Sequence, residues 1–274
     1  MPRILVKNFD LESTLFCGQL FRVSRRNDWY DIVSRDRIFH VRQSANHLEF
    51  QGIDREFLSH YFALDEPYSA ILQEINRDRH IGKAIRRHYG LRIIRQDPWE
   101  CLISFLCSSA ANIPKIKLNL EILSQSFGEK VTVKGREIHT FPKPGDLNDY
   151  EQIVRAKTGF RAKYLKAAND LVSDAFLLSL KNLPYGEAKK ALKDIPGIGD
   201  KIADCILLFS LGFTEAFPID TWMKKILQKL YFKNQQVSNQ ELQNFGAEYF
   251  GKYAGYAQQF LYMLARESDG DRIS

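Results

Sequence analysis

A lysine and an aspartate in the last third of the chain have the types and spacing that covalent chemistry needs. Lys201 falls in the first turn of an expected helix over 200–211, in the segment PGIGDKIADCILLFSL. The start of a helix disfavours a cation, and partial desolvation adds to that effect, so some of the amine would be neutral near neutral pH. A neutral amine is a nucleophile. A solvated lysine, or one that only contacts a phosphate, remains an alternative interpretation.

Asp220 follows the segment FPI and precedes the amphipathic run TWMKKILQKL, so it is a natural N-cap for a helix over 221–231. Capping alone would explain an aspartate at this position. An antiparallel return of the chain after the Lys201 helix could also place the carboxylate beside the start of that helix. The pattern therefore predicts either a cap or an electrostatic partner for a nucleophilic lysine.

Gly197 and Gly199, in the segment PGIG, indicate a tight turn between helices over 185–193 and 200–211. Glycine permits a positive φ and the close approach of another backbone. The amides that open the second helix would point outward together, which is a phosphate-binding device without sequence preference. An ordinary turn between two helices remains open, and so does a cation on the carbonyls of 195–198, which we do not count as a cofactor.

The elements that must position these residues indicate an α+β fold. Short β-branched and aromatic segments at 29–33, 37–43 and 47–51 predict an antiparallel sheet in a small N-terminal domain, 1–95. A larger all-helical domain, 96–274, would carry the helix–hairpin–helix motif at about 192–211 and the Asp220 loop. Asp97, Pro98 and Glu100 mark one helix start. Helices are expected at 54–64, 69–77, 80–90, 97–110, 112–127, 147–157, 161–175, 185–193, 200–211, 221–231, 239–250 and 253–266, with an irregular connection over 129–146.

The composition favours a polyanionic partner and excludes several classes of protein. The 274 residues carry a formal net charge of +6 and a pI near 9.0. The four cysteines are far apart and form no C-x-x-C pair, so we expect buried thiols of a reducing compartment rather than a zinc or iron–sulfur site. We expect neither a membrane span nor a signal peptide, because no apolar run is long enough.

The segments PGIGDKIADC and FPIDTW resemble the helix–hairpin–helix, Gly/Pro and Asp signature of base-excision DNA glycosylases, and the lysine in the hairpin is typical of the bifunctional members. Four other segments extend the likeness over roughly residues 12–266. In order and spacing the chain resembles the 8-oxoguanine DNA glycosylase family. The segments are CGQLFR (17–22), DPWECLISFLCSSAANIPKI (97–116), TGFRAKYL (158–165) and GYAQQFLY (255–262).

The resemblance implies a base-excision mechanism on double-stranded DNA that contains oxidised guanine. The damaged nucleotide would be flipped into a pocket, where Lys201 attacks C1′, displaces the base and forms a Schiff base. β-Elimination would then nick the strand, and Asp220 would stabilise the positive charge that develops on the sugar. It further implies a monomer without a cofactor or metal, in the cytoplasm or nucleoid of a prokaryote or the nucleus of a eukaryote, and not secreted.

The resemblance also implies the residues that recognise the base. The Gly18 carbonyl would accept a hydrogen bond from the N7–H that distinguishes 8-oxoguanine, and Gln258 would read the Watson–Crick edge. Cys205 and Tyr262 would enclose the flipped base, with Tyr262 where the family usually has Phe. From the residues alone, Gly18 could be a turn glycine, Cys205 a core thiol and Gln258 an exposed helical glutamine.

Further positions would contact the DNA backbone and the opposite strand. Phe160 matches the wedge residue, usually Tyr, and Arg161 the arginine that reads the opposite base. Gly197 and Gly199 would bind phosphate through the hairpin, and Trp222 stands where a His usually lies near the catalytic Asp.

The chain departs from the family where better-known members have three consecutive asparagines. Here the residues are Ala110, Ala111 and Asn112, and Lys115 replaces an arginine that reads the orphan cytosine. Alanine cannot fill the vacated stack, and lysine lacks the planar fork of arginine. We therefore expect only weak discrimination of the opposite base.

Two other functions are compatible with a helix–hairpin–helix chain. A monofunctional alkylated-base DNA glycosylase would lack the hairpin lysine, and Lys201 argues against it. A non-catalytic DNA-binding protein would use the hairpin only for phosphate. Borohydride trapping separates them, because a covalent adduct requires the lysine Schiff base.

Overall fold

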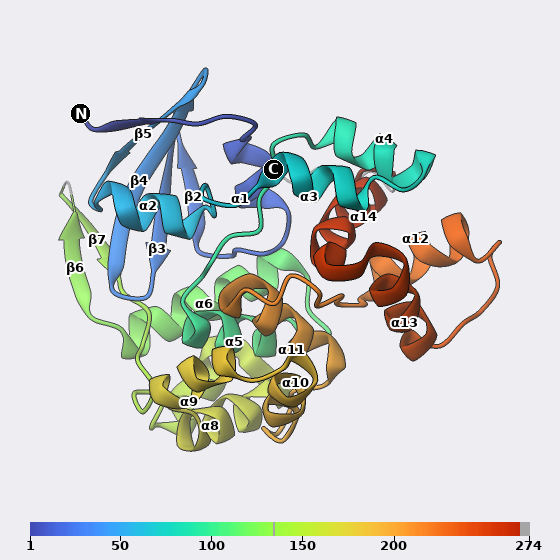
Figure 1. The fold of residues 1–274 in the computed structure, drawn as a ribbon. Helices are drawn as coiled ribbons and strands as arrows, with labels where there is room; N and C mark the ends of the chain where they lie inside the picture. The colour runs from blue at the N-terminus through green and yellow to red at the C-terminus, as the bar shows by residue number, and fades with distance from the viewer. Residues whose placement is uncertain (134, 269–274) are drawn as a thin grey trace.

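A five-stranded antiparallel sheet forms the N-terminal part of the computed structural model, which describes residues 1–133 and 135–268 (Figure 1). The strand order is β1-β5-β4-β3-β2. The three predicted strands are confirmed, whereas β1, β2 and helix α1 were missed. Their bounds are β1 Arg3–Leu5, α1 Leu11–Phe16, β2 Val23–Arg26, β3 Trp29–Ser34, β4 Arg37–Ser44 and β5 His47–Gln51.

Alternation along the strands gives this sheet a buried face. Ile32 pairs with Phe39 across β3 and β4, and Val41 pairs with Phe50 across β4 and β5. All four side chains are buried and belong to a core that also includes residues of α1 and of α2 (Arg55–Tyr61). The period of two places the apolar side chains on one face, and the two helices cover it.

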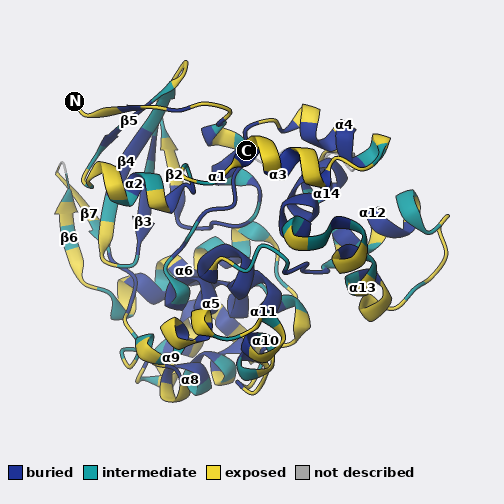
Figure 2. Cartoon of the chain, viewed as in Figure 1, coloured by how far each residue is buried: buried dark blue, intermediate teal, exposed yellow. Residues whose placement is uncertain are grey.

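The rest of the described chain is mainly helical and shares a second core. Figure 2 shows its buried residues concentrated at the centre of the helical body, around α5 and α11. All residues of α5 except Pro98 are buried, as its apolar sequence predicted. The helices are α3 Tyr68–Ile75, α4 Arg79–Arg87, α5 Pro98–Cys107, α6 Ile113–Phe127, α7 Tyr150–Ile153, α8 Ala162–Leu171, α9 Asp174–Ser179, α10 Tyr185–Lys193, α11 Asp200–Ile206, α12 Thr221–Tyr231, α13 Asn239–Phe250 and α14 Ala254–Ser268.

The two cores do not divide the chain where the sequence changes from strand-type to helix-type patterning. Helices α3 and α4 lie within the predicted N-terminal domain, 1–95, yet their buried residues belong to the second core, where they pack against α14. The domain boundary at 95 stays a prediction.

Three predicted segments were wrong in detail. The helix expected over 97–110 ends at Cys107, and Ala110 has a φ of +50°, outside the helical region. The segment 129–146, expected to be irregular, contains the hairpin of β6 (Lys130–Val133) and β7 (Arg136–His139), whose short alternation was obscured by lysine and glycine. The helix expected over 161–175 divides into α8 and α9, because Ser173 caps a new helix by accepting a hydrogen bond from the Phe176 amide at 3.2 Å.

Candidate active site

The hairpin between α10 and α11 contains the turn that the two glycines predicted. Gly197 has a φ of +90°, and a Cβ there would lie 2.5 Å from Cγ of Tyr164, so both conformation and space require glycine. Gly199 is the N-cap of α11 in an extended conformation, and a Cβ there would meet nothing within 4 Å. The steric requirement for glycine therefore applies to Gly197 alone.

Lys201 lies in the first turn of α11, as predicted, and its side chain is held against α5. Its Nζ donates a hydrogen bond to Oγ of Ser108 at 3.0 Å. The same Nζ lies 5.1 Å from the centroid of the Phe105 ring, a cation–π distance. The half-buried amine thus has defined partners on a neighbouring helix, unlike a freely solvated lysine.

Asp220 is the N-cap of α12 and also an electrostatic neighbour of Lys201. Its Oδ1 accepts a hydrogen bond from the Met223 amide at 2.8 Å, which is the predicted cap. Burial raises the pKa of the Asp220 carboxyl, while that amide and the charge of Lys201 act in the opposite direction. No ion pair within 4.0 Å joins Asp220 to Lys201 among the described residues. The two predicted roles of Asp220 are therefore compatible.

Gly18 and Tyr262 lie against each other although they are distant in the sequence. Gly18 has a φ of +81°, and a Cβ there would lie 2.9 Å from the Tyr262 hydroxyl oxygen and 3.1 Å from Cε1 of the ring. A side chain at position 18 would therefore fill the space in front of the ring. The contact brings the loop after α1 to α14, where Gln258 also lies.

Gln258 is buried, with 4% of its surface exposed, so the expectation of an exposed helical glutamine was wrong. Helix α14 packs against α3, α4, α12 and α13, which leaves this turn of the helix no solvent-facing side. The Oε1 atom of Gln258 has no hydrogen-bond partner within the described chain. A buried amide without a partner is costly, and a ligand that donates to it would remove that cost.

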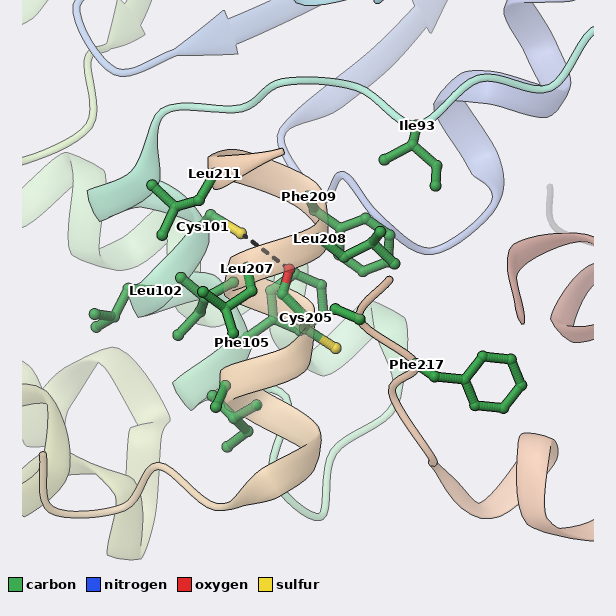
Figure 3. Close-up of a cluster of buried hydrophobic side chains, with 14 of the residues drawn as sticks. Ile93, Cys101, Leu102, Phe105, Cys205, Leu207, Leu208, Phe209, Leu211 and Phe217 are labelled. Atoms are coloured by element: carbon green, nitrogen blue, oxygen red, sulfur yellow. Dashed lines mark hydrogen bonds between the residues drawn. The ribbon is translucent and has the colours of Figure 1, made fainter. Parts of the chain in front are cut away.

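Cys205 lies one turn after Lys201 in the apolar cluster between α5 and α11 (Figure 3). Burial raises the pKa of its thiol to about 12, so the sulfur is an uncharged, polarizable contact surface. Its carbonyl lies 4.0 Å from Sγ of Cys101. All four cysteines are free and buried, as predicted.

Arg266 is a site neighbour that the sequence did not single out. Its guanidinium donates to the Tyr262 hydroxyl at 3.4 Å, and it acts electrostatically on Asp220. Its Nε is buried without a partner in the part of the chain described. The sequence feature that could have indicated Arg266 is its position four residues after Tyr262, because this spacing places both side chains on one face of α14.

The two residues expected to act at the opposite strand differ sharply in exposure. Phe160 is 54% exposed, as a wedge residue would be. Arg161 is buried and donates to the carbonyls of Ser109 at 2.6 Å, Ala110 at 3.0 Å and Thr158 at 3.0 Å. In this structure its guanidinium therefore fixes the backbone at Ser109 and Ala110.

The remaining predicted DNA contacts have structural roles as well. Asn112 caps α6 by accepting a hydrogen bond from the Lys115 amide at 3.0 Å, and Lys115 is half-buried. Ala110 has a φ of +50°, a region that asparagine adopts more readily than alanine. Trp222 is half-buried against the second core, with Lys225 Nζ 5.3 Å from its ring.

Asp204 forms a buried polar network that fixes α11. It accepts hydrogen bonds from the Tyr185 hydroxyl at 2.6 Å, Lys189 Nζ at 3.0 Å and Gln243 Nε2 at 2.7 Å. These partners come from α10 and α13, so the network joins three helices. Sequence reasoning missed it, although an aspartate within an apolar helix was the signal.

Within residues 1–133 and 135–268, no three His, Cys, Asp or Glu side chains come close enough to hold a metal ion. No helix in the described part of the chain is long and apolar enough to cross a membrane.

Comparison with known proteins gives a consistent result. Residues 3–102 match the family model for the N-terminal domain of 8-oxoguanine DNA glycosylase. An 8-oxoguanine glycosylase/lyase of Clostridium acetobutylicum, solved with double-stranded DNA containing cytosine opposite 8-oxoG, is 36% identical with a TM-score of 0.92, over 96% of this chain and 94% of that one. MBOgg1, solved with a low-affinity DNA ligand, is 35% identical with a TM-score of 0.92, over 97% and 96%. N-glycosylase/DNA lyase OGG1 of Arabidopsis thaliana is 33% identical over 82% of this chain, which covers 64% of that protein.

The fold, the hairpin lysine and these relatives define an N-glycosylase/DNA lyase of the helix–hairpin–helix type. Within that class, the chain belongs to the 8-oxoguanine DNA glycosylase family.

Proposed function

We propose that this protein flips 8-oxoguanine out of double-stranded DNA, excises it and nicks the strand at the resulting abasic site. The observation that carries the proposal is the amine of Lys201, held in the first turn of α11 with the half-buried Asp220 as its electrostatic neighbour. The names of the relatives agree with a combined glycosylase and lyase activity.

In the proposed reaction, Lys201 Nζ attacks C1′ of the damaged nucleotide after losing a proton. The bond from C1′ to the base breaks, and the base leaves with the electron pair and takes up a proton. The C1′–O4′ bond then breaks, O4′ takes up a proton, and an iminium forms between C1′ and Nζ. Loss of a proton from C2′ expels the 3′ phosphate. Asp220 stabilises the positive charge on the sugar. The raised pKa of its carboxyl also suits a group that accepts the proton from the amine.

Recognition of the base is assigned to residues around the Gly18–Tyr262 contact. The Gly18 carbonyl accepts from the N7–H of 8-oxoguanine, which guanine lacks, and the unpartnered Gln258 amide pairs with the Watson–Crick edge. Cys205 and Tyr262 enclose the two faces of the base. Burial keeps both uncharged, since it raises the pKa of each to about 12.

On the DNA side, the hairpin glycines Gly197 and Gly199 bind phosphate through the backbone, and Asn112, Lys115 and Trp222 contact the DNA as well. Phe160 enters the stack, while discrimination of the opposite base is weak. We infer a monomer that acts where the genome lies, in a nucleoid or nucleus.

Borohydride trapping on a duplex containing 8-oxoguanine tests this proposal. We expect a covalent adduct and strand cleavage with the natural protein and neither with Lys201→Gln, while duplex binding stays within about tenfold, since phosphate contacts supply most of the affinity. Lys181→Gln, an exposed lysine after α9, is the control and should trap normally. Cleavage by Lys201→Gln would refute the role of Lys201. Release of base without any adduct from the natural protein would favour a monofunctional enzyme.

A further inference from the structure

The amine of Lys201 is held by a hydroxyl that belongs to another helix and to no part of the mechanism described above. Ser108 follows the last residue of α5, and its Oγ lies 3.0 Å from Lys201 Nζ. The same Oγ lies 2.7 Å from the carbonyl oxygen of Phe105, one turn back in α5. Three groups therefore line up: a carbonyl, a hydroxyl and the amine.

The chemistry of these groups fixes the direction of each hydrogen bond. The Phe105 carbonyl can only accept, so the single proton of the Ser108 hydroxyl goes to it. The lone pairs of Oγ then remain for an N–H of Lys201. An amine with one N–H directed at Ser108 has its remaining positions, including the lone pair after deprotonation, directed away from the Ser108 oxygen. The hydroxyl thus determines which way the nucleophile faces.

Two helix ends meet at this amine with opposite electrostatic effects. The first turn of α11 disfavours a positive charge, whereas the C-terminal end of α5, next to Ser108, favours one. The Phe105 ring, 5.1 Å from Nζ, acts in the same sense as the end of α5. The side chain of Lys201 is therefore drawn toward α5.

Ser108 is itself held rigidly. The carbonyls of the next two residues, Ser109 and Ala110, accept hydrogen bonds from the buried guanidinium of Arg161. A group that positions a nucleophile is effective only when its own backbone is fixed. The hydrogen bonds from Arg161 fix the backbone next to Ser108.

We propose that Ser108 is a positioning residue for the nucleophile, which holds Lys201 Nζ by one hydrogen bond and directs its lone pair toward the site of the flipped nucleotide. The inference rests on the proposed role of Lys201. It adds a residue that makes no contact with the base and acts only through the amine.

The test compares Ser108→Ala and Ser108→Thr by single-turnover excision from an 8-oxoguanine duplex, by borohydride trapping and by affinity for a duplex with a tetrahydrofuran abasic-site analogue. We expect the alanine variant to excise and trap about tenfold or more slowly at unchanged affinity, because the amine loses its orienting partner. Threonine keeps a hydroxyl that can bond the carbonyl one turn back, so it should restore most of the rate.

Ser179→Ala is the matched control. Ser179, at the end of α9, donates to the Phe176 carbonyl at 2.7 Å in the same way, but it is exposed, and no lysine of the described chain donates a hydrogen bond to its hydroxyl. A rate equal to that of the natural protein in Ser108→Ala would overturn the inference, as would a threonine variant as slow as the alanine variant with the melting temperature of the natural protein. If the natural protein itself forms no adduct, the proposed function fails instead.

Discussion

Glu100 offers a test of the structure through the pH dependence of stability. This residue of α5 is 4% exposed; its Oε2 accepts a hydrogen bond from the Arg35 amide at 2.6 Å, while Oε1 has no partner in the described chain. Burial raises the pKa of the Glu100 carboxyl from its ordinary 4.5 to about 7, against the opposing charge of Arg22. The folded protein therefore binds a proton at Glu100 more tightly than the unfolded chain does.

The sign and size of the effect follow from that difference. A raised pKa contributes stability that is fully present below about pH 4.5 and is lost as the pH rises through about 7. Each pKa unit corresponds to about 1.4 kcal/mol, so the buried group accounts for a loss on the order of 3 kcal/mol in the free energy of unfolding across this window. Glu100→Gln keeps an acceptor for the Arg35 amide and has no proton to lose, so its stability should not fall in this way.

Urea unfolding at half-unit intervals between pH 5 and 8 measures the difference. We expect the free energy of unfolding of Glu100→Gln minus that of the natural protein to rise with pH by roughly 1–3 kcal/mol. Glu248→Gln, an exposed glutamate on α13, is the control for the loss of a carboxylate. A difference that stays constant across the range would show that Glu100 is ionised in the folded protein, and the reasoning from burial would be wrong.

Two further predictions concern the reaction itself. Asp220→Asn keeps an equivalent N-cap for α12, so its melting temperature should change little, while single-turnover excision should fall by about 10²-fold or more if the carboxylate stabilises charge; near-normal excision would leave only the capping role. Excision of 8-oxoguanine should vary within about tenfold among duplexes with C, T, G or A opposite, because Ala110 and Lys115 lack the usual contacts, each worth ~1–3 kcal/mol, and Arg161 is engaged with backbone. A preference for cytosine above about 100-fold would contradict this.

Helix starts were predictable because an N-cap is a local interaction. Asp97, Asn112 and Asp220 each accept a hydrogen bond from the amide three residues later, so a few adjacent letters contain the whole signal. β1 pairs with the distant strand β5, whereas β2 forms a hairpin with the adjacent β3, and both strands are short. Nothing within Arg3–Leu5 or Val23–Arg26 distinguishes a strand from a loop, which is why both were missed.

The positions of Lys201 and Asp220 in their helices were predictable for the same reason, since a glycine turn and a cap locate them. The side chains that surround Lys201 and Asp220 were not predictable from the sequence. Ser108 contacts Lys201 across 93 positions of sequence, and the burial of Gln258 depends on how α14 packs among four other helices. Periodicity locates the apolar face of a helix but does not show which polar side chain the packing will bury beside it.

The residues proposed to carry out the chemistry and the residues proposed to recognise the base lie in different parts of the fold. The nucleophile and its carboxylate belong to one short stretch around α11 and α12, whereas the pocket depends on Gly18, which follows the first helix of the chain, lying against Tyr262 in α14. A substitution that moves the Gly18 loop would therefore weaken selection of the oxidised base and leave the lyase step on a preformed abasic site intact. Since Gly18 has a φ of +81° and faces the ring at contact distance, even Gly18→Ala would force the loop away from Tyr262.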